Sequence, residues 1–133
     1  MKTVFADAFF FFALVNPRDA AHSAAVALAR ARPGRLLTTA FVLIEVADGL
    51  VTTPDRSLFQ EILADLEQKP GATIVPPTQD LFERGIGLYI SRPDKQWSLT
   101  DCISFVVMKE HDITEALTAD HHFEQAGFVA LLK

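Results

Sequence analysis

Short apolar runs of strand length alternate along this chain with longer segments in which apolar residues recur at helical spacing. The clearest helical stripe consists of Leu58, Phe59, Ile62, Leu63 and Leu66. Proline, glycine or threonine marks most of the boundaries between segments. Strands that alternate with helices indicate an α/β protein with a largely parallel sheet. The pattern predicts strands over 3–6, 36–38, 73–75, 115–118 and 128–131, and helices over 9–15, 19–32, 40–50, 55–66 (opened by Thr53-Pro54), 79–91 and 102–108.

Length and composition fit one folded domain. A chain of 133 residues buries roughly two-thirds of its unfolded surface when it folds as a single unit. Half of the residues are hydrophobic and 22% are charged, which excludes a disordered chain. The single cysteine, Cys102, excludes an internal disulfide and a thiolate zinc cluster. We therefore expect residues 1–133 to form one domain.

The N-terminus needs to be distinguished from a targeting signal. Lys2 and the apolar residues 8–15 resemble the start of a signal peptide. However, Asp7 lies within that segment, the uninterrupted apolar run is short, and no convincing cleavage site follows. No segment approaches the roughly 20 apolar residues that are needed to cross a bilayer. We therefore expect a cytoplasmic protein that has no membrane partner.

Four acids stand against an apolar background. Asp7 and Asp120 each follow a predicted strand, and Asp101 opens the predicted helix 102–108. Loops after parallel strands converge at the carboxyl edge of a sheet, and a helix start favours negative charge. Glu45 lies in an apolar helix, where burial is costly without a cation or a donor nearby. Carboxylate oxygens are the ligands that Mg²⁺ and Mn²⁺ prefer, so these four acids predict a metal site. The net charge of −5 argues against a broadly basic nucleic-acid surface, but it is compatible with a nuclease that holds cations through carboxylates.

Each acid lies in a short motif. The motifs are Phe5-Ala6-Asp7, Phe41-Val42-Leu43-Ile44-Glu45, Leu99-Thr100-Asp101 and Thr118-Ala119-Asp120-His121-His122-Phe123. They resemble the four acidic motifs of the PIN domains, a family of metal-dependent ribonucleases that includes the VapC-type toxins of bacterial toxin–antitoxin pairs. The resemblance covers essentially the whole chain in the expected order. Any one motif is weak, whereas four in register on an α/β pattern of this length are specific.

The resemblance implies a three-layer α/β/α fold with a mostly parallel sheet of about five strands. It also implies hydrolysis of RNA by a metal-activated water, with one or two Mg²⁺ or Mn²⁺ ions. A small antitoxin protein and a homodimer are the partners that the family implies. The ligands carried over are Asp7, Glu45, Asp101 and Asp120, and Thr118 and Thr100 would orient them through hydrogen bonds.

Other residues are interpreted more simply. His121 and His122 are expected to form a surface turn, because successive side chains point apart. Trp97 is interpreted as a core anchor rather than a base-stacking residue. Three cations in loops beside the expected site are weaker candidates for phosphate contacts: Arg18, Arg92 and Lys95.

Two alternatives remain open. After the first aspartate the family usually carries a small hydroxyl residue, whereas Ala8 and Phe9 stand here. This departure motivates a second hypothesis, a non-catalytic PIN-fold module that binds RNA or a protein. A receiver-like signalling domain is a third hypothesis. Such a domain requires an acidic pair after the first strand and a lysine at a later strand end, and Asp7 has no acidic neighbour in the sequence.

Overall fold

The computed structural model describes residues 2–31, 34–52 and 54–133, and a five-stranded sheet lies at its centre. The strand order is β3-β2-β1-β4-β5, and every neighbouring pair is parallel. This confirms the predicted fold class. The strands are β1 (Thr3–Ala6), β2 (Arg35–Thr39), β3 (Ala72–Val75), β4 (Glu115–Leu117) and β5 (Val129–Ala130). The helices are α1 (Ala8–Val15), α2 (His22–Ala31), α3 (Ala40–Gly49), α4 (Arg56–Gln68), α5 (Gln79–Ser91), α6 (Leu99–Glu110) and α7 (His121–Gln125).

Element boundaries follow local hydrogen bonds. Thr39 and Thr78 cap α3 and α5, because each side chain accepts a hydrogen bond from a backbone N–H of the first turn. Helix α2 begins at His22, later than the predicted Asp19, because the Asp19 carboxylate instead accepts the Ala21 N–H in a turn at 2.8 Å. The predicted helix end at Arg32-Pro33 and the predicted opening at Thr53 lie outside the described residues.

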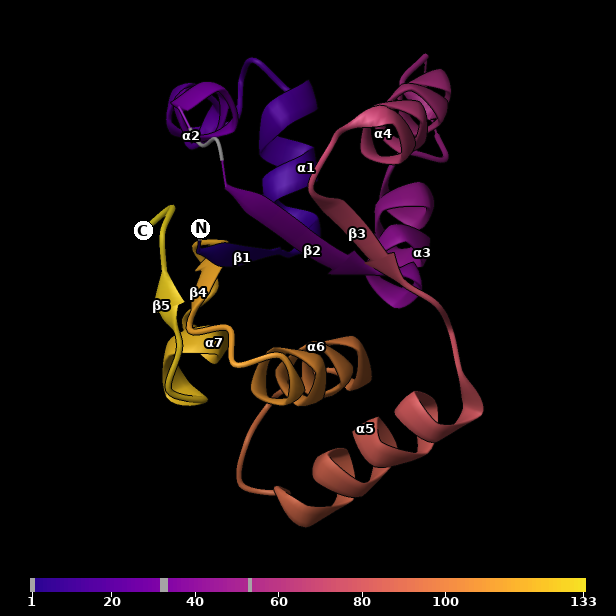
Figure 1. The fold of residues 1–133 in the computed structure, drawn as a ribbon, viewed down its shortest axis with the longest axis vertical. Helices are drawn as coiled ribbons and strands as arrows, with labels where there is room; N and C mark the ends of the chain where they lie inside the picture. Colours follow the sequence, from indigo (N-terminus) through magenta and orange to yellow (C-terminus); the bar gives the residue numbers. More distant parts are fainter. Residues whose placement is uncertain (1, 32–33, 53) are drawn as a thin grey trace.

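The helices cover both faces of the sheet (Figure 1). Helices α1, α2 and α4 lie on one side, and α6 and α7 lie on the other, with α5 packed outside α6. Helix α3 extends from the carboxyl end of β2 and contacts α1, α4 and α6. The three layers put two hydrophobic cores on the two faces of one sheet, which is the arrangement expected when parallel strands alternate with helices.

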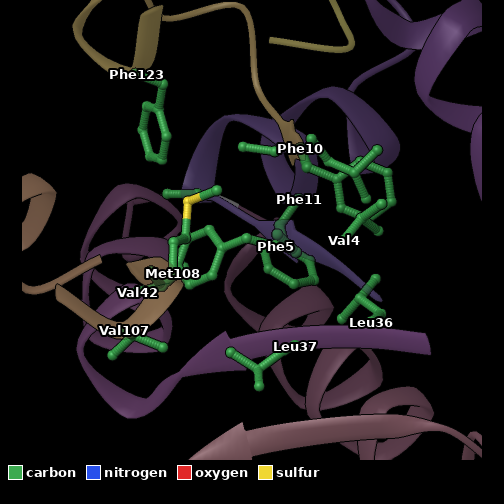
Figure 2. Packing of buried hydrophobic residues seen from close by; sticks show 14 of the residues in the cluster. Val4, Phe5, Phe10, Phe11, Leu36, Leu37, Val42, Val107, Met108 and Phe123 are labelled. Atoms are coloured by element: carbon green, nitrogen blue, oxygen red, sulfur yellow. The ribbon is translucent and has the colours of Figure 1, made fainter. Parts of the chain in front are cut away.

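Alternate residues of β1 fill these two cores. Figure 2 shows Phe5 on the side of Met108, while Val4 lies near Phe10 on the other side. All four side chains are at most 3% exposed. On the α6 side, the Phe105 ring lies 5.1 Å from that of Trp97 and 5.0 Å from that of Phe123, both edge-on. Trp97 is buried and its indole N–H donates to Gln125 at 3.0 Å, as expected for a core anchor.

Helix α5 packs closely on α6 at Gly85, and this contact predicts how two glycine substitutions affect stability. A Cβ atom added at Gly85 would clash with Cγ1 of Ile103 and lie 3.4 Å from its Cα, whereas nothing lies within 4 Å at Gly87. Gly85→Ala should therefore lower the free energy of unfolding by about 1–3 kcal/mol. Gly87→Ala, on the same helix, should raise it by up to about 1 kcal/mol through helix propensity. Urea denaturation of both variants tests this, and equal effects would contradict it.

None of the described helices combines the length and the apolar character needed to span a membrane.

Candidate functional site

The predicted acids meet at the carboxyl edge of the sheet, beside β1 and β4. The chain passes from β1 to β2 on one side, whereas β4 and β5 lie on the other side. Such a change of direction opens a crevice outside the carboxyl ends of the strands. Asp7 follows β1 and begins α1, and the segment from Thr118 to Asp120 follows β4. The sheet therefore brings together two segments that are separated by more than a hundred residues.

Asp7 is held by Thr118. The Thr118 hydroxyl donates to Oδ2 of Asp7 at 2.9 Å and accepts the backbone N–H of Asp120 at 3.1 Å. The Asp7 residue is 6% exposed, and its side chain does not form a capping hydrogen bond although it begins α1. The Asp7 carboxyl group therefore does not cap α1, and it lies against the Thr118 hydroxyl instead.

Asp101 lies in a capping box at the start of α6. Its backbone N–H donates to the Ser98 hydroxyl at 3.0 Å, and its Oδ2 accepts the Ser98 N–H at 3.2 Å. This fixes the carboxylate against the first turn of the helix. Thr100 was expected to orient Asp101, but its side chain makes no hydrogen bond to a described residue. Ser98 has that role, because the capping residue precedes Asp101 by three positions.

Its apolar neighbours in the sequence suggested that Glu45 is buried, but the residue is exposed. It lies on an exposed part of α3, between Ile44, which is also exposed, and the buried Val46. Glu45 is exposed although its neighbours are apolar, because a helix with apolar residues on several faces still has one face in contact with solvent. Its carboxyl group nevertheless has enough neighbouring atoms for desolvation to raise its pKa, followed by the negative charges of Asp101 and Asp120.

Each of the four acids affects the pKa of at least one other, or has its own pKa raised by one of them. The pKa of Asp7 is raised to about 7, because burial and, to a smaller extent, the charges of Asp101 and Glu45 raise it more than the Thr118 hydrogen bond lowers it. Burial also raises the pKa of Asp101, and so does the nearby charge of Asp120. Such a cluster of acids disfavours its own ionisation and is stabilised by a cation.

The two histidines do not form a surface turn as expected. They begin α7, for which Asp120 is the N-cap, and the centroids of their rings lie 4.4 Å apart. Nδ1 of His122 lies 3.2 Å from Oδ2 of Asp101 and 3.3 Å from Oδ1 of Asp120. Ligand atoms of Asp120, His121 and His122 all lie within 4.8 Å of one another. The sequence signal for this turn of the chain was Asp120, a residue type that commonly caps helices, and the helix that it caps directs His122 towards the acids.

The candidate cations differ in position. Arg18 lies beyond the far end of α1, about 12 Å of helix from Asp7, so it is not beside the carboxylates as expected. Arg92 and Lys95 lie in the loop between α5 and α6 and line a hollow of about 1040 Å³. The hollow is also lined by Trp97 and Ser98, and Ser98 bonds to Asp101. Arg92 lies 5.1 Å above the Trp97 ring and pairs with Asp94 at 2.9 Å.

Sequence comparison relates the chain to characterised nucleases. A sequence profile of the PIN domain matches residues 4–129. Over 126 residues the chain is 29% identical to the 23S rRNA-specific endonuclease VapC20 of Mycobacterium tuberculosis, covering 95% of each sequence. The crystal structure of that protein, described as a sarcin–ricin loop cleaving toxin, matches with a TM-score of 0.83 at 28% identity. The match covers 95% of this chain and 96% of that one.

More distant structures share the fold. FitAcB from Neisseria gonorrhoeae matches with a TM-score of 0.64 at 16% identity, covering 96% of this chain and 94% of that one. VapBC2 from Rickettsia felis, bound to a DNA fragment from their promoter, matches with a TM-score of 0.66 at 10% identity and 96% coverage of both chains. The profile match spans all five strands except the first residue of β1 and the last of β5, together with all four acids. This chain belongs to the PIN domain family.

Proposed function

We propose that this chain is an endoribonuclease that depends on Mg²⁺ or Mn²⁺ and acts as the toxin of a toxin–antitoxin pair. The observation that carries the proposal is the convergence of Asp7, Asp101 and Asp120 at the carboxyl edge of the sheet, around Thr118 and His122. Glu45 belongs to the same group, because the charges of Asp101 and Asp120 raise its pKa. We also propose a cytoplasmic location, as expected from the sequence. A homodimer that a small antitoxin silences is proposed from the family resemblance.

The residues present fit a divalent metal ion. The pKa of Asp7 is raised to about 7, mainly because the carboxyl group is buried beside other acids. A cation stabilises the ionised form of such a buried carboxyl group more than a hydrogen-bond donor does. Hard divalent ions favour oxygen ligands of this kind. Asp7, Glu45, Asp101 and Asp120 would hold the ion. When bound, it lowers the pKa of a water molecule and stabilises the charge that develops on a phosphate.

RNA is the substrate that the comparison supports. VapC20 is named as a 23S rRNA-specific endonuclease, and its structure is described as that of a sarcin–ricin loop cleaving toxin. An attack of water on a phosphodiester does not itself need the ribose 2′-hydroxyl. The choice of RNA over DNA therefore rests on this likeness, and ribosomal RNA is the first substrate to test.

The test is cleavage of a mixed RNA pool that includes ribosomal RNA, with Mn²⁺, with EDTA, and with the Asp101→Asn variant in parallel. Cleavage that requires both the metal and Asp101 supports the proposal. A folded protein that binds neither Mn²⁺ nor Mg²⁺ in calorimetry would contradict it. That result would favour the non-catalytic PIN-fold module, for which Ala8 and Phe9 after Asp7 are the motivation.

Arg92 and Lys95 should contribute to RNA binding through the hollow beside Ser98. In an inactive Asp101→Asn background, the pair Arg92→Gln and Lys95→Gln should weaken RNA binding about fivefold or more and reduce its dependence on salt. The control is the pair Arg56→Gln and Lys69→Gln, which changes the net charge equally at the two ends of α4, on the other side of the sheet. Fluorescence anisotropy at several salt concentrations measures this, and equal losses in the two pairs would contradict a specific role for the hollow.

A further inference from the structure

We propose that His122 is a positioning residue. Its Nδ1–H donates to Asp101 and lies beside Asp120, to which its backbone N–H donates, and these contacts leave one oxygen of each carboxylate available for the divalent ion. The inference rests on the proposed metal-dependent function, and it assigns a role to a side chain that is not among the four predicted ligands.

The geometry places His122 between two acids from different elements. Its Nδ1 lies 3.2 Å from Oδ2 of Asp101, in the first turn of α6, and 3.3 Å from Oδ1 of Asp120, which precedes α7. The backbone N–H of His122 also donates to Oδ1 of Asp120 at 2.9 Å. The side chain of His122 is 19% exposed, so the ring is held within the site rather than extended into solvent.

The chemistry of the contacts fixes which ring nitrogen carries the proton. An ionised carboxylate has only acceptor atoms, so a nitrogen that faces two carboxylates must be a donor. A protonated Nδ1 has no lone pair to offer to a metal ion. His122 therefore acts on the ion through the carboxylates, in the manner of the outer hydrogen bonds that orient metal ligands.

The contacts occupy one oxygen of each carboxylate. Oδ2 of Asp101 accepts from both the Ser98 N–H and His122, at 3.2 Å each. Oδ1 of Asp120 is the oxygen nearest His122. Within the described part of the chain, no donor bonds to the second oxygen of either carboxylate. The two acids are thus held from one side, and the opposite oxygens remain for an ion.

This positioning matters because nothing else in the described residues joins the two carboxylates. Asp101 is fixed to α6 by Ser98, whereas Asp120 lies in the connection after β4, where its backbone is held by Thr118. Two ionised carboxylates that both lie within 3.3 Å of the same nitrogen repel each other. The Nδ1–H of His122, placed beside both of them, opposes that repulsion and lowers the rearrangement required when an ion binds.

A histidine outside the site provides a control. His111 follows the end of α6, at the opposite end of that helix from Asp101, and it is exposed. His111→Ala should therefore leave metal affinity almost unchanged.

The test compares His122→Asn with His122→Gln. The amide nitrogen of asparagine is as many bonds from the backbone as Nδ1, whereas that of glutamine corresponds to Nε2. Binding of Mn²⁺ to the full chain is measured by calorimetry, after circular dichroism confirms that each variant is folded. We expect His122→Gln and His122→Ala to weaken Mn²⁺ binding about tenfold or more, and His122→Asn to stay within about threefold of the wild type.

The outcomes distinguish a failure of the role proposed for His122 from a failure of the proposed metal-dependent function. A loss in His122→Asn together with retained binding in His122→Gln would overturn the proposal, because it would make Nε2 a direct ligand. Wild-type affinity in all of the His122 variants, or an equal loss in all of them, would also overturn it. Failure of the wild-type chain to bind Mn²⁺ would instead remove the proposed function itself.

Discussion

The Asp101→Asn variant should cleave RNA more than about a hundredfold more slowly than the wild type and should keep its fold. Even outer residues of metal sites commonly contribute ten- to a hundredfold to affinity or activity, and the loss of a charged ligand should exceed that. An asparagine Oδ1 can still accept the Ser98 N–H and the His122 donor, so the start of α6 should be preserved. Initial rates of RNA cleavage in Mn²⁺, together with thermal unfolding, test both parts.

Asp80→Asn is the matched control. Asp80 also lies in the first turn of a helix, but in α5, where it pairs with Arg84 at 3.0 Å on the exposed surface. An exposed pair of this kind contributes little to stability, so the control should retain wild-type cleavage. Full activity of Asp101→Asn, or an equal loss in Asp80→Asn, would contradict a specific role for the Asp101 carboxylate.

The sequence was sufficient for the fold because local and long-range signals agree. Apolar β1 and β2 pair in parallel, from Thr3 opposite Arg35 to Phe5 opposite Leu37. Three helices begin where a threonine or serine caps them, namely α3 at Thr39, α5 at Thr78 and α6 at Ser98. The five-residue α7 was missed, because periodicity needs a longer segment than His121–Gln125 to be recognised.

The site was less predictable than the fold. The convergence of Asp7, Asp101 and Asp120 follows from strand ends and a helix start, so their positions could be inferred. The exposure of Glu45 and the inward position of His122 depend on how helices rotate against the sheet. A linear sequence does not fix that rotation. Thr100 and Ser98 illustrate the same point, because two hydroxyl residues near Asp101 were equivalent in sequence and only one caps the helix.

The metal-free protein should become less stable as the pH rises from about 4 to about 7, and Asp7 should be a main cause. The folded state raises the pKa of Asp7 from 3.8 to about 7, chiefly because the carboxyl group is buried. Within this window the folded state binds more protons than the unfolded state, so the free energy of unfolding falls with increasing pH. The stability is fully present below the unfolded pKa and is lost as the pH passes through the folded pKa. The loss is of the order of a few kcal/mol.

The Asp7→Asn variant isolates this contribution. Asparagine cannot ionise, and its Oδ1 can still accept the Thr118 hydroxyl. In EDTA, the variant should gain stability relative to the wild type as the pH increases, with the largest difference at pH 8. The other titrating groups remain in both proteins, so the difference between their urea denaturation curves at pH 5, 6, 7 and 8 reports mainly on Asp7. A difference that does not change with pH would contradict the assignment.

Adding Mn²⁺ should reverse the order of stability at pH 8. An ion that binds the folded state stabilises it by an amount that increases with the logarithm of its affinity, and the wild type has the additional carboxylate with which to bind it. The wild type should therefore gain more from saturating Mn²⁺ than Asp7→Asn does. The same burial that makes Asp7 costly in the metal-free protein then becomes the reason that the site favours a cation. If Mn²⁺ stabilised both proteins equally, Asp7 would be a buried acid without a part in metal binding.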